Sequence, residues 1–82
     1  MTARVLFFSV LQDIAGKGEH VIALPAAGAR VGDLLAVLFE NWPALREWDR
    51  SLLIAVNHAY ARRDDEVPAD AEVAVMPPVQ GG

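Results

Sequence analysis

The first apolar stretch of the chain has the composition of a β-strand. Residues 4–10 are rich in aromatic and β-branched side chains and too short for a stable helix, so we expect a central strand buried on both faces. Residues 11–15 predict one or two helical turns. These turns end at Gly16-Lys17-Gly18, because glycine supplies the positive φ of a helix stop. The apolar segment 19–24 then predicts a second strand, which ends at Pro25.

The middle of the chain carries a helical stripe. Apolar residues recur at spacings of three and four at Val31, Leu34, Leu35, Leu38, Phe39 and Trp42. This main helix is expected to end before Pro43, because the residue preceding a proline avoids helical conformation. Its start is weakly signalled, since Arg30 is a poor cap and Asp33 offers only favourable first-turn charge. A short helical turn is expected over residues 44–48.

Two further apolar segments, residues 52–57 and 72–76, predict strands in the second half of the chain. Asn57-His58 suits a turn into a short segment over residues 59–61. Strands in pairs at each end, with one substantial helix between them, predict an α+β fold of the ubiquitin-like β-grasp type, with the helix on one face of a mixed sheet. We therefore expect a domain over residues 1–76 and a flexible, extended tail over residues 77–82.

Composition narrows the possible functions. The chain has 82 residues, of which 54% are hydrophobic and 22% charged, as expected for one folded domain. Its net charge of -4 disfavours nucleic acid and anionic membranes as partners, and favours basic proteins. No apolar run is long enough to span a bilayer and the N-terminus does not resemble a signal peptide, so we expect a cytoplasmic protein. The chain has no cysteine, which excludes disulfides and thiolate chemistry on side chains.

The C-terminal tail is the strongest functional signal. Pro77-Pro78 ends the last strand, because proline has no N–H to donate, and directs the chain outward. Residues 77–82 extend to about 20 Å, enough to enter a channel in another protein, and Gly81 and Gly82 have no side chains to obstruct it. A frayed, inert end is the alternative interpretation.

The chemical candidate on this tail is its terminal carboxyl group. That group is ionised at neutral pH and is a poor electrophile, so it must first be activated, for example as a mixed anhydride with AMP. A sulfur or amine nucleophile could then attack the carbonyl of Gly82. The chain has no phosphate-binding glycine loop, so a partner enzyme must perform the activation.

Several segments together resemble the small subunit of molybdopterin synthase, a MoaD-type sulfur carrier of the MoaD/ThiS family. They are Val5-Leu6-Phe7-Phe8, Leu11 through Ala15-Gly16, Val31-Gly32-Asp33-Leu34-Leu35, Ala55-Val56-Asn57, and Glu72-Val73-Ala74 with Pro77-Pro78-Val79-Gln80-Gly81-Gly82. The last strand running into Pro-Pro-Val-x-Gly-Gly is the most specific part. The resemblance covers nearly the whole chain.

The resemblance implies a function and a set of partners. Gly82 would be adenylated by a partner similar to ubiquitin-activating enzymes, which uses ATP, and converted to a thiocarboxylate with sulfur from a donor protein. The tail would then enter the large synthase subunit, with Gly81, which has no side chain, next to Gly82. The complex would be a heterotetramer with two copies of each subunit. There the sulfur would pass to cyclic pyranopterin monophosphate during molybdenum cofactor biosynthesis. The chain alone would be a non-catalytic carrier without a bound cofactor or metal.

The resemblance also implies a docking surface on the open face of the sheet. Its members here would be Phe8, Tyr60 and Met76, with Pro77, Pro78 and Val79 at the start of the tail. Ordinary core packing is the alternative for the first three. The chain departs from the family pattern at Ala69-Asp70-Ala71-Glu72, where relatives usually have Asp-Gly-Asp-Glu, so the conformation of this turn is open.

Other functions and residues remain possible at this point. A carrier serving thiamine, cysteine or tRNA thiolation would share the fold and the tail, and so would a ubiquitin-like modifier joined to lysines. His20 and His58 have no partners at metal-ligand spacing, and Trp42 and Trp48 are expected to pack in the core. The acidic segment 64–66 is expected to be a solvated loop or a contact for a basic partner.

Overall fold

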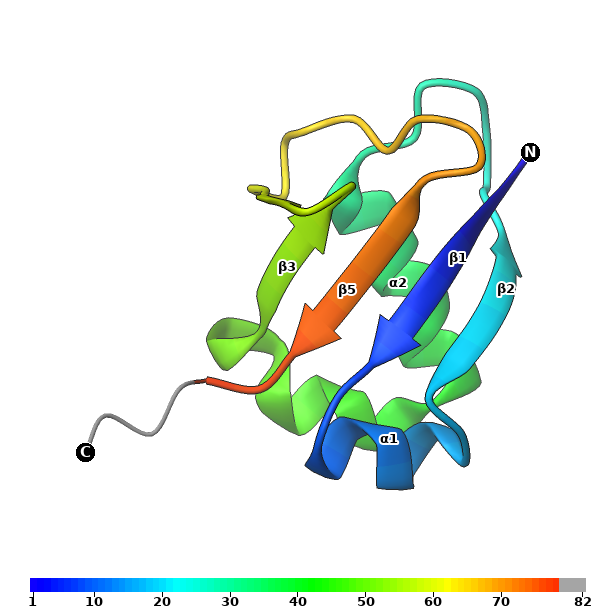
Figure 1. Cartoon of the computed structure of the whole chain (residues 1–82). Coiled ribbons are helices and arrows are strands. Elements are labelled where there is room, and N and C mark those ends of the chain that lie inside the picture. Colours follow the sequence, from blue (N-terminus) through cyan, green and yellow to red (C-terminus); the bar gives the residue numbers. More distant parts are fainter. Residues whose placement is uncertain (79–82) are drawn as a thin grey trace.

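A five-stranded mixed sheet, with one long helix lying across one of its faces, forms the body of the molecule (Figure 1). The computed structural model describes residues 1–78, so the predicted site residues Val79, Gly81 and Gly82 lie outside the described residues. In chain order the elements are β1 (Thr2–Phe7), α1 (Val10–Ala15), β2 (Glu19–Ala23), α2 (Val31–Asn41), the 3₁₀ helix η1 (Pro43–Ser51), β3 (Leu53–Val56), β4 (Ala59–Tyr60) and β5 (Glu72–Met76).

The sheet brings the first and last strands together, in the order β2-β1-β5-β3-β4. β1 pairs antiparallel with β2 and parallel with β5, while β5 pairs antiparallel with β3. Phe7 and Val75 are register partners, so the two parallel strands end at the same edge of the sheet. The prediction of an α+β β-grasp fold, with a helix on one face of a mixed sheet, is confirmed.

β1 differs from its prediction in extent and burial. It spans Thr2–Phe7 rather than residues 4–10, but it is an interior strand as expected, paired with β2 on one side and β5 on the other. Val5 and Phe7 are buried, whereas Arg4 is exposed. The prediction of burial on both faces is therefore wrong, because α2 covers only one face of the sheet and leaves the other open (Figure 1).

The core lies between the sheet and α2. The predicted helical stripe supplies much of it, since all of its members except Trp42 are buried and Trp42 packs against the core from its edge. α2 ends at Asn41, as Pro43 predicts. The following 3₁₀ helix spans Pro43–Ser51 and is longer than the expected turn over residues 44–48.

The start of α2 is held by hydrogen bonds that the local sequence did not reveal. The backbone N–H of Arg30 donates to Oδ2 of Asp33 at 2.9 Å, so Asp33 caps the helix as well as contributing charge. The backbone N–H of Val31 donates to the carbonyl oxygen of Asp65 at 2.8 Å. The acidic segment 64–66 thus has exposed side chains, as expected, but its backbone also closes the helix end.

The turn before β5 settles the conformation that the sequence left open. Pro68 to Ala71 form a turn in which the N–H of Ala71 donates to the carbonyl of Pro68 at 3.1 Å. Asp70, the third residue of this turn, has a φ of 63°. A positive φ at this position is typical of type II turns, which favour glycine there. Asp70 therefore adopts the backbone conformation that a glycine would adopt with less strain.

We expect Asp70→Gly to raise the free energy of unfolding by about 0.5 kcal/mol, because glycine adopts positive φ without the steric cost of a Cβ. Urea unfolding with an unchanged m-value measures the effect. Ala69→Gly is the matched control, since Ala69 does not have a positive φ and should lose stability. An Asp70→Gly protein less stable than the Ala69→Gly protein would contradict the prediction.

Candidate functional site

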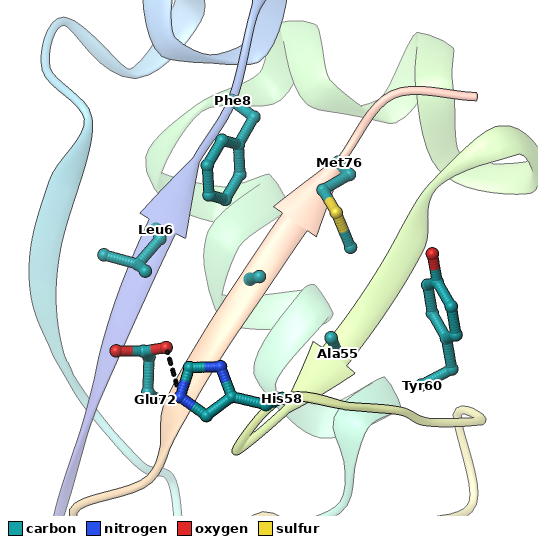
Figure 2. Close-up of a pocket in the computed structure, with 8 residues that line it drawn as sticks. Leu6, Phe8, Ala55, His58, Tyr60, Glu72 and Met76 are labelled. Carbon is teal, nitrogen blue, oxygen red and sulfur yellow. Dashed lines mark ion pairs between the residues drawn. The ribbon is translucent and has the colours of Figure 1, made fainter. Parts of the chain in front are cut away.

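The face of the sheet that α2 leaves open carries a shallow apolar hollow of about 390 Å³ (Figure 2). Phe8 and Met76 lie at one end of it, and Tyr60 lies at its side. Phe8 and Tyr60 are 45% and 77% exposed as whole residues, while Met76 is half-buried. The three residues of the predicted docking surface therefore lie around one hollow, and Phe8 and Tyr60 are not core residues.

The floor of the hollow is made of small side chains. Ala55 of β3 and Ala74 of β5 are cross-strand partners, and Leu6 of β1 lies opposite Ala74 on the other side. Larger side chains stand around the two alanines, so the middle of the face is recessed (Figure 2). The recess comes from three strands that are far apart in the sequence and become neighbours only in the sheet.

The hairpin between β3 and β4 positions Tyr60 and His58. Val56 and Ala59 are register partners, so the turn has two central residues, Asn57 and His58, with φ values of 49° and 72°. Positive φ at both positions is the signature of a type I′ turn, which matches the twist of the flanking strands. Asparagine suits the first position, but His58 occupies a position that usually favours glycine. The turn places the imidazole at the rim of the hollow (Figure 2).

A polar cluster closes the end of the hollow opposite Phe8 and Met76. Glu72 Oε1 lies 2.8 Å from a guanidinium nitrogen of Arg4, and Glu72 Oε2 lies 3.4 Å from His58 Nε2. The Glu72 side chain is 23% exposed, compared with 52% for Arg4 and 83% for His58. The carboxylate is therefore the best covered member of the cluster.

The sequence did not reveal this polar cluster. The sequence places His58 in a turn without partners at metal-ligand spacing, and it gives no sign that Arg4 and Glu72 meet. The period-two alternation of β1 and β5 puts Arg4 and Glu72 on the open face, but their contact depends on the register Arg4↔Glu72 between parallel strands. That pairing is set by the sheet, not by either strand alone.

The base of the predicted tail lies beside the hollow. Pro77 and Pro78 are half-buried and follow directly on Met76, the last residue of β5. Because β1 and β5 are parallel, Phe8 follows the end of β1 at this same edge. The apolar end of the hollow is therefore the end from which the chain continues towards Val79.

The remaining candidate residues have structural contacts. His20 Nε2 lies 3.0 Å from the carbonyl oxygen of Ala15, and its ring packs against Phe7 and Trp42 with centroid distances of 5.8 and 4.6 Å. Trp48 packs against the core, as expected. In the part of the chain that the structure describes, no three side chains of His, Asp or Glu come together in a way that could hold a metal ion. Within residues 1–78 no helix is both long and apolar enough to cross a membrane.

Comparisons with known proteins agree with the fold and extend to the tail. Residues 5–82 match the model of the ThiS family. The molybdopterin synthase sulfur carrier subunit of Chlamydomonas reinhardtii is 37% identical over 84 aligned positions, which cover 100% of both chains.

Solved structures show the same arrangement of strands and helices. A Pyrococcus furiosus protein assigned as molybdopterin converting factor, subunit 1, superimposes with a TM-score of 0.86 at 32% identity, covering 96% of this chain and 99% of that one. A chain in the complex of subunits 1 and 2 of the Helicobacter pylori molybdopterin-converting factor has a TM-score of 0.70 at 23% identity, covering 100% of both chains. These likenesses support the assignment of the β-grasp fold.

Proposed function

Because the chain belongs to the ThiS family, we propose that it is the sulfur-carrier subunit of a molybdopterin synthase and that it carries sulfur on the terminal carbonyl of Gly82. The observation that carries this proposal is the match to the Chlamydomonas sulfur carrier subunit along the full length of both chains. The ThiS match, which runs through residue 82, supports the tail as part of the shared unit.

The chemistry of the proposed cycle requires partner enzymes. An oxygen of the Gly82 carboxylate attacks the α-phosphorus of ATP on an adenylyltransferase that resembles ubiquitin-activating enzymes, and pyrophosphate leaves. Sulfide supplied by a donor protein then attacks the carbonyl carbon of Gly82, the bond from that carbon to the AMP oxygen breaks, and AMP leaves, which gives a thiocarboxylate. The loaded tail delivers this sulfur to cyclic pyranopterin monophosphate in the large subunit. The chain needs only an accessible carbonyl at Gly82. Gly81 has no side chain, so the tail stays narrow next to this carbonyl.

The open face of the sheet is the proposed docking surface for these partners. Phe8, Tyr60 and Met76 supply aromatic and adaptable apolar contacts, which are the side chains that dominate protein interfaces. Pro77, Pro78 and Val79 would line the entrance to the partner's channel. The complete synthase would contain two copies of this chain and two of the large subunit, and would work in the cytoplasm.

Mass spectrometry of the protein purified from cells with intact sulfur transfer tests the proposal. We expect one oxygen-to-sulfur exchange, confined to the C-terminal peptide. Reconstitution with a large synthase subunit and the pterin precursor should then produce molybdopterin. Isopeptide-linked Gly-Gly on lysines, without the exchange, would instead indicate a protein modifier. Activity in a thiazole assay, without molybdopterin formation, would indicate a carrier for thiamine.

A further inference from the structure

Glu72 is a rigidly held carboxylate at the far end of the hollow. Its backbone N–H donates to Oδ1 of Asn57 at 2.9 Å, and its carbonyl accepts from the N–H of Asn57 at 2.8 Å. Arg4 donates to Oε1 at 2.8 Å. Backbone and side chain are thus both fixed, so little side-chain entropy would be lost if Glu72 formed another contact.

The second carboxylate oxygen of Glu72 faces a side chain that is largely exposed. His58 Nε2 lies 3.4 Å from Oε2, and the imidazole is 83% exposed. An ion pair of this exposure contributes little to stability. His58 also holds its positive φ at a conformational cost. Oε2 is therefore an acceptor that an approaching donor can reach by displacing His58.

The position of Glu72 relative to the tail bears on what binds there. Glu72 lies four residues before Met76 on the same strand, about 13 Å away at 3.3 Å per residue. Pro77 and Pro78 follow Met76 and lead away from the sheet (Figure 1), so the start of the tail leaves at the end of β5 opposite Glu72. A protein that accepts the tail must cover the end of the sheet from which the tail leaves.

We propose that the large subunit binds this face at two points, with a large apolar side chain in the hollow above Ala55 and Ala74 and an arginine or lysine on Oε2 of Glu72. The inference rests on the proposed function. A cationic side chain suits the net charge of -4 on this chain and the fixed carboxylate at the rim. The ion pair and the base of the tail lie at opposite ends of the hollow, so together they would fix the direction in which the tail enters the large subunit.

Glu72→Gln tests the ionic contact, because it removes the charge while keeping an oxygen that can accept from Arg4. We expect the Kd for the large subunit to rise about tenfold or more, since truncating one side of a covered charge pair leaves the other unpaired. We also expect the variant's affinity to depend less on salt than that of the wild type. Isothermal titration at two salt concentrations measures both effects.

Glu19→Gln is the matched control. Glu19 is the register partner of Leu6 and lies on the same open face, but on the outer strand β2 and outside the hollow. Glu19→Gln removes the same charge as Glu72→Gln. If only the contact at Glu72 matters, the Kd of the Glu19→Gln variant for the large subunit should stay within about twofold of the wild-type value. Equal effects of Glu72→Gln and Glu19→Gln would show that overall charge is responsible, and would overturn the proposal.

His58→Gly separates the roles of the two residues on Oε2. Glycine suits the positive φ of position 58 and removes the cover, so affinity should be unchanged or increased. A loss of affinity as large as that of Glu72→Gln would make His58 the contact and overturn the assignment to Glu72. Sedimentation of the chain alone provides another test, because a homodimer that Glu72→Gln dissociates would identify a second copy as the occupant.

The outcomes distinguish this inference from the proposed function. If the wild-type chain neither binds the large subunit nor supports molybdopterin formation, the proposed function fails. If it does both and Glu72→Gln binds as well as wild type, only the two-point docking fails. The same holds if Glu72→Gln weakens the adenylation step alone, because the cation would then belong to the activating enzyme.

Discussion

Deletion of Gly82 is expected to abolish sulfur transfer while leaving the fold intact. The deletion moves the terminal carbonyl back by one residue, about 3.3 to 3.6 Å, which takes it out of reach of a nucleophile fixed in a partner's channel. A misplacement of about 1 Å can already cost about a hundredfold in rate. Molybdopterin formation in the reconstituted synthase measures the loss.

Two controls belong to the Gly82 experiment. A chain extended by one glycine keeps a slender end and shifts the carbonyl by the same distance in the opposite direction, so it should be nearly as inactive. The thermal unfolding midpoint of the shortened chain should equal that of the wild type, because the core lies within residues 3–75. Unchanged sulfur transfer after deletion would exclude Gly82 as the carrier position.

Introducing a carboxylate at Tyr60 or Phe8 is expected to weaken binding of the large subunit about 30-fold or more. Aromatic side chains at the centre of an interface commonly contribute 2 kcal/mol or more, and the new charge would lose its hydration on docking. Tyr60 is 77% exposed and Phe8 45%, so Tyr60→Asp and Phe8→Asp should leave stability nearly unchanged. Titration with the large subunit and urea unfolding separate the two effects.

Val21→Asp is the matched control for these substitutions. Val21 is 68% exposed and lies on the open face, as the register partner of Arg4, but it does not line the hollow. It tests whether any new carboxylate on this face is enough to weaken binding. If Val21→Asp weakens binding as strongly as Tyr60→Asp, the hollow is not the docking site. If Tyr60→Asp unfolds the domain, Tyr60 stabilises the fold and its loss of binding says nothing about docking.

Local patterns were sufficient where the cause acts over a few residues. The stripe from Val31 to Trp42 predicted α2, because the helical period depends only on neighbouring turns. Pro77 predicted the end of β5, since a missing N–H interrupts the ladder at that residue. The Gly-Gly end predicted the reactive position by chemistry alone, and Gly82 itself lies outside the described residues.

Local patterns failed where the cause is a distant segment. Residues 5–8 are all apolar, and only the placement of α2 on one side of the sheet decides that Leu6 is half-buried while Phe7 is buried. The sequence near the start of α2 offers no strong capping residue. Part of the cap comes instead from the carbonyl oxygen of Asp65, more than thirty positions away, which accepts from the N–H of Val31.

The sequence by itself determined most of the strand and helix segments, because periodicity, proline and glycine act locally, and it predicts the chemistry of the glycine end. Only the tertiary structure decided which side chains gather around the hollow on the open face. The parallel pairing of β1 with β5 puts Phe8 beside Met76 and Arg4 beside Glu72, and the β3 to β4 hairpin adds Tyr60 and His58. Strand register depends on burial and pairing across the whole sheet, so no single segment encodes it.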